Sequence, residues 1–356
     1  MENLLTFFVF LSILVFTIGL DHHGNNPRNG NNILIEIIVR EQWKHWGSTK
    51  MRGSMLAEQI NRVPGFEAIV VPHKQFLKQT EDWKEASVKR SVICVCMKYC
   101  DMEIINRCKV GLKRTMVWDM IDTELRFYHL VPHFDLVLAN SHHHAQILQS
   151  RYNATNTQVV YHHHSNDFGL DRNLSVENWI PRNGSFCYVG AFRLNSSAVQ
   201  SFSAIAERVS MRFVDINTAK LPSGSQYEHL LPLATQCDVA LIWPTTFDEF
   251  TLEYRPVTRL VTWWSMGIPT IYYPYAPYME IGDVATRQLA ASTYLEVYQK
   301  LAAICNSTNR INILRIVGLQ KRKSTHFQLS VLLHSYLSAL SSVSERINIS
   351  DYSLLL

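Results

Sequence analysis

The sequence lacks any long block of Lys or Arg residues, although its formal charge is positive. Its 34 basic and 30 acidic residues give a net charge of +4 and are spread along the chain. Nucleic-acid scaffolds are normally marked by a clustered basic surface, so this function class is disfavoured. A local anion site remains compatible with the composition.

Cysteines at metal-binding spacings are also absent. The seven cysteines are an odd number and form no pair of closely spaced pairs, which disfavours a zinc ribbon or a disulfide scaffold. Cys94 and Cys96 alternate along an expected strand and so share one face, where small buried side chains are usual. Cys100 and Cys108 allow a bridge in an oxidising compartment.

Short-period repeats are missing, and low complexity is limited to an Asn-rich stretch near the N-terminus. Hydrophobic residues make up 47% of the chain and charged residues 18%, which excludes a mainly disordered protein. At 356 residues the chain is too long for one small core. Two domains of similar size are therefore expected.

An uncharged apolar run extends from Leu4 to Leu20, and no Lys or Arg precedes it. The run is a targeting segment whose length lies between a cleaved signal peptide and a short type II membrane anchor. Six sequons agree with an exported eukaryotic chain; they lie at Asn153, Asn173, Asn183, Asn195, Asn306 and Asn348. We expect a secretory-pathway protein, either in the lumen of the ER or Golgi or secreted.

Runs rich in β-formers alternate with longer helical stretches in the first half of the chain. The expected strands are Ile33 to Val39, Phe66 to Val71, Ser91 to Met97, Thr115 to Met120, Phe134 to Leu138 and Gln158 to His162. Several of these runs are apolar at consecutive positions, as in parallel strands covered on both faces. The pattern predicts a doubly wound α/β sheet.

The same alternation restarts after a connector rich in Asn, Asp and Gly. Its strands are expected at Phe186 to Phe192, Met211 to Ile216, Cys237 to Trp243 and Thr270 to Tyr273, with helices such as Ala198 to Val209, Pro256 to Met266, Tyr294 to Cys305 and Phe327 to Leu340. We divide the chain into a targeting segment at 1–20, a linker at 21–32, an N-terminal acceptor domain at 33–165, a connector at 166–184, a C-terminal donor domain at 185–325, and a helix and tail at 326–356. Two doubly wound domains in series create a cleft between the carboxyl ends of their sheets.

The stretch from Asp238 to Ile281 is the most informative part of the sequence. A buried strand is followed by a polar loop and by a helix that we expect to begin near Pro256. The free N–H groups of that helix would face the cleft, with Arg255 and Arg259 one turn apart beside them. This arrangement suits phosphate, and an Arg fork suits a diphosphate leaving group. The alternative is that both arginines are solvated or pair with nearby acidic residues.

Within this stretch, the run from Glu253 to Glu280 reads R-P-x-x-R-L, then G-I-P-T-I, then P-Y-x-x-Y-x-E. It resembles the donor-site helix of GT-B glycosyltransferases, which have two Rossmann-like domains facing across a cleft. The resemblance implies that Arg255, Thr258 and Arg259 bind the donor phosphates. It also implies a catalytic position for Glu253, near the ribose or the sugar. Many retaining members carry a second glutamate at the position of Thr262.

A second match is YVGAFRLNSS, in which a strand leads into a Gly-containing loop and a helix. The first loop of the second domain in GT-B enzymes helps to hold the donor phosphates, so the resemblance makes Gly190 and Arg193 candidates. A glycan on Asn195 would crowd this loop.

In the first domain, Gly47 and Ser48 follow the first expected strand and are candidates for an acceptor-side loop. Gly47 permits close backbone approach by a ligand, whereas Ser48 is equally suited to cap the next helix. The letters GSTK lack the Walker A spacing, which excludes a P-loop. Asp122, near the end of a central strand, is our candidate for the base that removes the acceptor's proton, and a helix cap is its alternative.

Two histidine triplets remain, at 142–144 and 162–164. On a strand, His162 and His164 would share a face, and neutral imidazoles there can bond a sugar or a pyrophosphate. We take both as donor-site candidates, with packing or metal binding as alternatives. GT-B enzymes usually need no metal, so we expect neither a metal nor another cofactor.

The sequence thus predicts a glycosyltransferase that moves a sugar from a nucleotide-sugar donor to a glycan, protein or lipid acceptor. One alternative is a non-catalytic, secreted GT-B-like module that binds a nucleotide or a glycan. The other is a His-rich metal-binding secretory protein. No nucleic-acid partner is expected.

Overall fold

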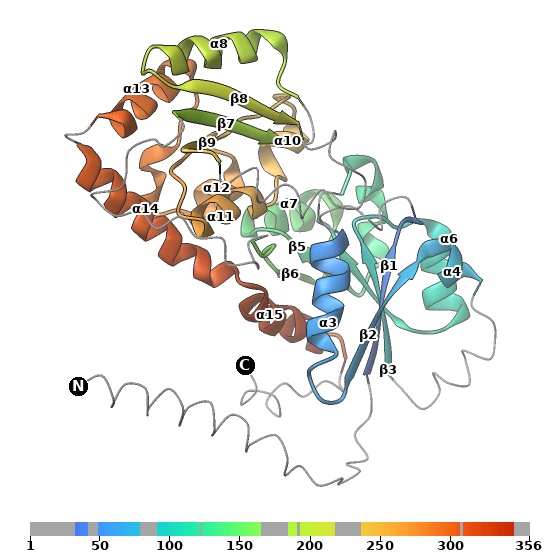
Figure 1. Ribbon diagram of the computed structural model, residues 1–356. Helices are drawn as coiled ribbons and strands as arrows, with labels where there is room; N and C mark the ends of the chain where they lie inside the picture. Colours follow the sequence, from blue (N-terminus) through green and yellow to red (C-terminus); the bar gives the residue numbers. More distant parts are fainter. Residues whose placement is uncertain are drawn as a thin grey trace, which may run out of the picture. The chain divides into compact units, whose positions relative to one another are not determined.

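The computed structural model describes residues 33–41, 49–78, 91–121, 123–164, 184–190, 193–217, 236–306 and 309–344. The targeting segment, the linker, Gly47, Ser48, Asp122 and the connector core at 166–183 lie outside these ranges. Residues Asn32–Leu356 form one compact unit, which contains two parallel sheets (Figure 1).

The first sheet has the strand order β2-β1-β3-β4-β5-β6, and all its pairs are parallel. Its strands are β1 (Ile33–Val39), β2 (Phe66–Pro72), β3 (Ser91–Met97), β4 (Thr115–Asp119), β5 (Leu136–Ala139) and β6 (Thr157–Val159). Every residue of β1 is buried, as expected for a central strand with helices on both faces. The order reverses between β1 and β3, so this is a doubly wound sheet.

Short helices connect these strands. They are η2 (Lys50–Met55), α3 (Leu56–Ile60), α4 (His73–Leu77), α6 (Met102–Asn106), η3 (Arg107–Gly111), η4 (Leu125–His133) and α7 (His142–Tyr152). Helix α7 begins at the cap Ser141, whose hydroxyl accepts the N–H of His144 at 3.0 Å, and ends at Asn153 in the left-handed conformation.

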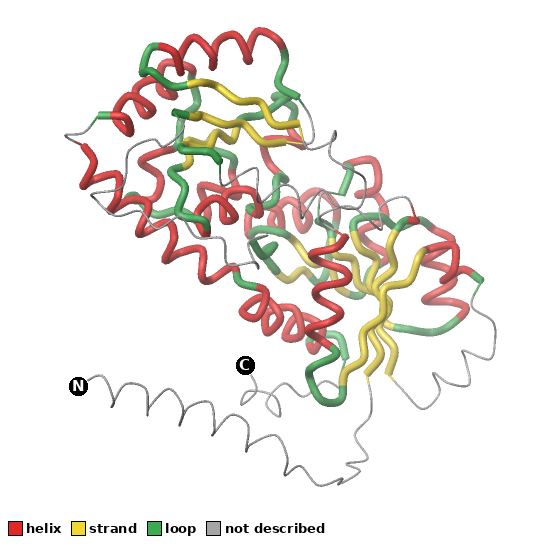
Figure 2. Tube along the Cα trace, viewed as in Figure 1, coloured by secondary structure: helices red, strands yellow, loops and turns green. Residues whose placement is uncertain are grey.

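The second sheet has the order β10-β9-β7-β8, again with parallel pairs only. Its strands are β7 (Ser185–Gly190), β8 (Arg212–Asn217), β9 (Val239–Ile242) and β10 (Thr270–Tyr272). The helices of this half are α8 (Ser196–Glu207), α10 (Glu249–Glu253), α11 (Thr258–Ser265), α12 (Ala276–Ile281), η6 (Thr286–Leu289), α13 (Tyr294–Cys305) and α14 (Arg310–Ser324). Figure 2 shows helices around both groups of strands.

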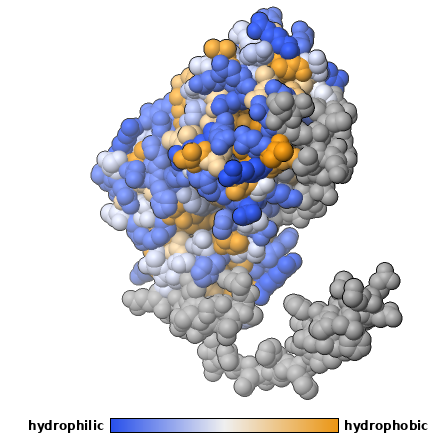
Figure 3. Space-filling model, turned by 90° about the vertical axis from the view of Figure 1, so that its left-hand side faces the viewer, coloured by the Kyte–Doolittle hydropathy of each residue, from blue (hydrophilic) through white to orange (hydrophobic). Residues whose placement is uncertain are grey.

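The chain then returns to the first sheet. After η8 (Thr325–Phe327), helix α15 (Leu329–Ser341) buries Leu333, Tyr336 and Leu340 in the cluster that contains Ile35 of β1. The last described helix therefore belongs to the core of the first domain and ties the two halves together. On the described part of the face in Figure 3, hydrophobic residues form only small separate patches. No helix within the described ranges combines the length and apolar character needed to cross a membrane.

The predicted α/β class with two doubly wound sheets is confirmed, with small differences in detail. The last strand of the first domain is shorter than predicted, because β6 ends at Val159. The N–H of Val160 still donates to the carbonyl of Ala139 on β5 at 2.9 Å, but residues 161–164 belong to no strand. His162 and His164 therefore do not share a strand face. The helix expected near Pro256 begins two residues later, at Thr258, and the polar loop before it contains α10.

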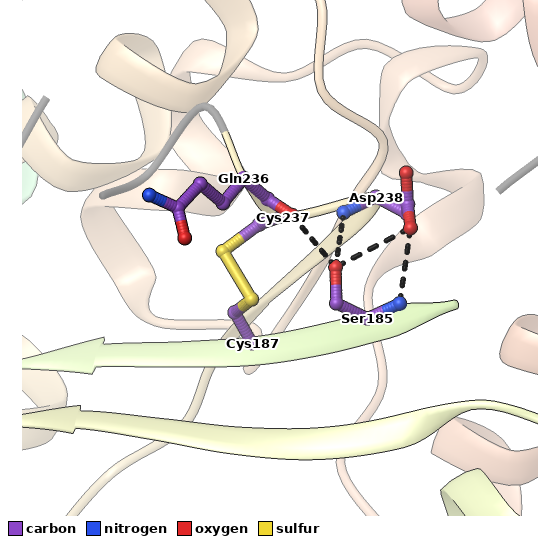
Figure 4. Close-up of a disulfide and its surroundings, with 5 residues drawn as sticks. All are labelled: Ser185, Cys187, Gln236, Cys237 and Asp238. Carbon is purple, nitrogen blue, oxygen red and sulfur yellow. Dashed lines mark hydrogen bonds between the residues drawn. A yellow bond between two sulfur atoms is a disulfide. The ribbon is translucent and has the colours of Figure 1, made fainter. Parts of the chain in front are cut away.

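A disulfide that the sequence analysis did not predict joins two strands of the second sheet. Cys187 lies on β7 and Cys237 two residues before β9, with Cα atoms 5.7 Å apart (Figure 4). Beside it, the Ser185 hydroxyl donates to the carbonyl of Gln236 at 2.8 Å, and the Ser185 N–H donates to Asp238 at 3.0 Å. A sequence separation of 50 residues hides this pair from spacing arguments. The Cys100–Cys108 bridge that the sequence allows is not formed.

Candidate functional site

The second sheet has its reversal of strand order between β7 and β9. Ligands of open α/β sheets bind at the carboxyl ends of the strands at such a reversal. Gly190 is the last residue of β7, and β9 leads through α10 into α11. The fold therefore directs both predicted donor segments to the same edge of the sheet.

The N-terminus of α11 has the features of an anion site. Its cap residue, Val257, has no side chain that can accept a hydrogen bond from the first turn. Thr258, the first helical residue, has a buried hydroxyl without a hydrogen-bond partner. The free N–H groups and the positive end of the helix dipole favour an anion here.

Arg259 lies in a cage of tyrosines beside this helix end. Tyr188 of β7 is hydrogen-bonded to the guanidinium, and Tyr275 and Tyr278 are its other close polar neighbours. One guanidinium nitrogen, Nη1, is buried without a hydrogen-bond partner among the described residues, and so is the hydroxyl of Tyr275. Such groups are costly to bury unless a ligand completes their hydrogen bonds.

Gly190 belongs to the same cluster through Tyr188. A Cβ at position 190 would lie 2.7 Å from the Tyr188 hydroxyl and 3.0 Å from its ring. Only glycine leaves room for the tyrosine to fold back over the strand end toward Arg259. The structure therefore brings Gly190, Thr258 and Arg259 together, as the sequence analysis expected.

The carboxylates that could neutralise Arg255 and Arg259 are held elsewhere. Asp248 caps α10 by accepting the N–H of Thr251 at 2.8 Å, and Glu249 forms an ion pair with Arg151. Glu253 contacts the imidazole of His143. Among the described residues, neither Arg255 nor Arg259 forms an ion pair. The alternative in which nearby acidic residues pair with these arginines is thus not what the structure has.

Glu253 and His143 come from different domains. Glu253 is the last residue of α10, and His143 lies in the first turn of α7, with the Nε2 of His143 hydrogen-bonded to the Glu253 carboxylate. Both side chains keep about a third of their surface exposed, at 34% and 36%. Beside them, the side chain of Asn140 donates to the carbonyl of Tyr254 at 2.9 Å. The two domains therefore meet next to the segment that leads into α11.

Glu280, the last residue of the quoted motif, forms a second link between the domains. Its two carboxylate oxygens accept the N–H groups of His142 and His143, at 2.8 and 2.9 Å. The hydroxyl of Tyr161 also donates to it. A carboxylate at a helix N-terminus is favoured by the free N–H groups and by the dipole. Glu280 of α12 thus caps α7 of the other domain.

Arg193 lies apart from this cluster. Its side chain is exposed and interacts with Asp215 of β8, whose pKa is raised by burial although the charge of Arg193 lowers it. Asn195 caps α8 by accepting the N–H of Ala198 at 2.8 Å through Oδ1, which leaves its amide nitrogen exposed for a glycan. No described contact joins Arg193 to Arg259.

His162 and His164 lie in the interior rather than on the cleft surface. His162 is 3% exposed; burial first, and then the charge of Arg52, lower its pKa to about 3. Burial also lowers the pKa of His164, whose N–H donates to the carbonyl of Phe327 at 2.9 Å. These surroundings favour neutral, packed imidazoles next to the chain segment that links the domains.

The catalytic candidate Asp122 and the loop candidates Gly47 and Ser48 lie outside the described residues. The other acidic residue of that segment, Asp119, is buried and bonded to Arg52 at 2.7 Å. Within the described part of the chain, no group of three or more His, Cys, Asp or Glu side chains is arranged to hold a metal ion.

Several residues of the site were missed by the sequence analysis. They are Tyr188, Tyr275 and Tyr278 around Arg259, and His143 with Asn140 at the domain contact. Tyr275 and Tyr278 stood in the quoted motif, so their spacing was a usable signal. His143 lay in a histidine triplet, but its partner is 110 residues away in the chain.

Comparisons with known proteins identify the architecture. No family model and no curated protein matches the sequence. Among solved structures, the chain is similar to Anabaena HepE in complex with UDP and glucose, at 11% identity and a TM-score of 0.57, covering 87% of this chain and 99% of that one. Sucrose-phosphate synthase from Thermosynechococcus elongatus is 8% identical with a TM-score of 0.59, covering 88% of this chain and 100% of that one. OtsA in its apo form is 9% identical with a TM-score of 0.53, covering 90% of this chain and 100% of that one. The chain therefore has the GT-B glycosyltransferase fold.

Proposed function

We propose that this protein is a glycosyltransferase that moves a sugar from a nucleotide diphosphate sugar to an acceptor hydroxyl. One observation carries the proposal: Arg255 and Arg259 lie at a helix N-terminus without an acidic partner among the described residues, while the three nearest acidic residues in sequence are bound elsewhere. A partly buried guanidinium without a counter-ion favours a bound anion.

The proposed reaction places the donor diphosphate at this helix end. As the glycosidic bond of the donor breaks, negative charge grows on the β-phosphate. Arg259, the hydroxyl of Thr258 and the free N–H groups of α11 stabilise that charge, and they are in place before the reaction. A guanidinium and a helix dipole supply positive charge without a metal, so the proposal includes no metal or other cofactor.

UDP sugars are the first donors to test. HepE was solved with UDP and glucose, and again with UDP-glucose. The identities of 11% and 13% are too low to transfer a substrate, so the support is architectural. The acceptor is a glycan, a protein or a lipid in our proposal.

We assign removal of the acceptor's proton to His143, with Glu253 as its orienting partner. Imidazole is a common general base in enzymes, and a carboxylate on one ring nitrogen fixes the tautomer so that the other nitrogen can accept a proton. Asp122, which the sequence suggested for this role, lies outside the described residues. The test is the pH profile of kcat: His143→Gln removes its acidic limb, whereas a purely structural His143 leaves the limb unchanged.

We place the protein in the secretory pathway, as a lumenal, anchored or secreted chain. The N-terminal apolar run and the six sequons support this location. The Cys187–Cys237 disulfide adds support, because such bonds persist in oxidising compartments.

Isothermal titration calorimetry of the protein with UDP, GDP and CMP tests the donor site. We expect micromolar to millimolar binding of one nucleotide, and a loss of about 10- to 100-fold in Arg259→Ala, because a charge-assisted hydrogen bond is worth about 1.5–3 kcal/mol. Arg322→Ala, an exposed arginine on α14, is the matched control. Equal affinity of wild type and Arg259→Ala would remove the phosphate assignment.

A non-catalytic binding module is the second candidate. Thr262 stands where many retaining members carry a glutamate, so α11 offers no carboxylate at this position. The threonine side chain is also buried, at 7% exposure. This candidate predicts nucleotide binding without turnover. Release of free sugar from the bound nucleotide sugar, or its transfer to any acceptor, excludes it.

A further inference from the structure

Two cysteines face each other at the carboxyl end of β3, in the middle of the first sheet. Cys96 is the penultimate residue of β3, and Cys100 follows four residues later. Their sulfur atoms are 2.8 Å apart, and both side chains are fully buried at 0% exposure. The structure has both as thiols. A disulfide needs about 2.05 Å between the sulfurs, so less than one ångström of movement separates the pair from a bond.

The backbone between them is shaped to bring the sulfurs together. Lys98 takes a left-handed conformation with φ 64°, which turns the chain back on itself directly after the strand. Two hydrogen bonds hold this turn: the Lys98 N–H donates to the carbonyl of Asp119 at 2.8 Å, and the Thr123 hydroxyl donates to the carbonyl of Lys98 at 2.9 Å. The proximity of Cys100 to Cys96 is thus imposed by the fold.

We propose that Cys96 and Cys100 form a disulfide in the exported protein. Each thiol loses its proton and the pair gives up two electrons as the S–S bond forms. Glutathione disulfide, or the disulfide of an oxidoreductase, accepts the electrons and both protons and is released as two thiols. The reaction passes through a mixed disulfide on one cysteine, which the thiolate of the other displaces.

The burial of the pair sets the time at which the bond forms. In the folded chain neither sulfur is accessible to an oxidant, and burial raises the pKa of Cys96, which disfavours the reactive thiolate. The bond therefore forms during folding, before α4 and α6 cover this face of the sheet. Once closed, it resists reductants until the protein unfolds.

The other cysteines of this domain support this particular pairing. Cys108 is hydrogen-bonded to Cys94 rather than to Cys100. Cys94 and Cys96 lie on the same side of β3, where Cys94 faces Cys108 and Cys96 faces Cys100. The bond would also fix the loop at the reversal between β1 and β3, where a ligand of the first domain would bind. This inference rests on the proposed secretory location and is independent of the proposed sugar transfer.

Peptide mapping of the full chain produced in eukaryotic cells tests the proposal. The protein is denatured in an alkylating reagent without reductant and then digested with trypsin. Cleavage after Lys98 separates Ser91–Lys98, which carries Cys94 and Cys96, from Tyr99–Arg107, which carries Cys100. Cys108 leaves on the dipeptide Cys108–Lys109. We expect Ser91–Lys98 linked to Tyr99–Arg107, with fragmentation on either side of Val95 assigning the bond to Cys96.

Single substitutions then check the pairing. The link persists in Cys94→Ser and in the matched control Cys305→Ser, and it disappears in Cys96→Ser. Alkylated Cys100 in the wild-type protein overturns the proposal, as does a link from Tyr99–Arg107 to Cys108–Lys109. Because the mapping of the wild type gives the answer, a variant that fails to fold leaves the proposal testable.

Discussion

Each of the two sheets carries an arginine at its carboxyl end, but among the described residues only Arg52 has a carboxylate partner. Arg52 donates to Asp119 at 2.7 Å and to two backbone carbonyls after β6 at 2.7 and 3.1 Å, and it lies over the ring of Tyr336. Among the described residues, the polar neighbours of Arg259 are tyrosines, and its Nη1 has no hydrogen-bond partner. The same residue type thus closes one sheet end and leaves the other open to a ligand.

The difference separates an arginine that stabilises the fold from an arginine that is available to a ligand. A buried guanidinium with a carboxylate and two carbonyls is complete, and its loss leaves a bare charge in the interior. A guanidinium beside a free helix N-terminus is incomplete, and an anion completes it. The comparison predicts opposite results for the same substitution at the two positions.

The largest effect is expected from Arg52→Met. The substitution leaves Asp119 buried without its cation, which costs about 3–5 kcal/mol in the free energy of unfolding. Urea denaturation followed by tryptophan fluorescence measures it. The double variant Arg52→Met/Asp119→Leu removes both charges and should recover most of the loss. If both variants are equally unstable, the ion pair is not the source of the loss.

The architecture could be predicted because it follows from local pattern. Consecutive apolar residues mark strands buried on both faces, and Ser91 to Met97 and Tyr294 to Cys305 were predicted at their observed bounds. The latter helix begins at a capping box of Thr293 and Glu296, a signal four residues long. The last strand of the first domain was predicted to continue to His162, because an alternating pattern of residues does not show where a strand stops pairing with its neighbour.

The site could be predicted only in part, because the role of each residue depends on partners that are distant in the sequence. Arg259 was visible from its spacing in the motif, but its tyrosine cage combines β7 with α12. The lack of an acidic partner depends on Arg151 and His143, which hold Glu249 and Glu253 from the other domain. No local pattern reports that a carboxylate is already engaged.

The next largest effect is expected from acid, which should lower the stability of the first domain through the buried His144. Burial, and then the charge of His143, lower the pKa of His144 to about 3, and its Nδ1 accepts the N–H of Asn140 at 3.4 Å. The unfolded chain binds a proton near pH 6.5 and the folded chain does not. Stability is therefore full above pH 6.5 and falls between about pH 6.5 and 3, by about 1.4 kcal/mol per pH unit for such a histidine.

Urea denaturation at several pH values between 7 and 4.5 measures this slope. His144→Gln should reduce it by about 1.4 kcal/mol per pH unit, whatever its effect on stability at pH 7. His334→Gln, on the exposed side of α15, is the control and should leave the slope unchanged. An unchanged slope in His144→Gln would mean that the imidazole is already protonated in the folded protein.

Arg259→Met sharpens the comparison, because it should change the free energy of unfolding by less than about 1 kcal/mol, whereas Arg52→Met lowers it by about 3–5 kcal/mol. Removing a charge that lacks a carboxylate relieves a desolvation cost instead of creating one. Thermal unfolding with and without the nucleotide that binds the wild type measures both properties. The ligand-induced rise in Tm should shrink or vanish in the variant. A large loss of stability without ligand would instead make Arg259 a structural residue like Arg52.

The smallest effect is expected from Gly190→Ala. The added Cβ meets the Tyr188 hydroxyl at 2.7 Å and turns the ring away from Arg259. Overpacking costs about 1–3 kcal/mol in the free energy of unfolding, and we expect the low end because a strand end can adjust. Because Arg259 loses the contact that orients its guanidinium, nucleotide Kd should rise roughly 3- to 10-fold. Gly318→Ala, in α14 with no atom within 4 Å of its Cβ, is the matched control and should leave Kd unchanged while raising stability slightly. Unchanged affinity in Gly190→Ala would mean that the cage orders Arg259 without Tyr188, and the open end of the second sheet would then depend on α11 and α12 alone.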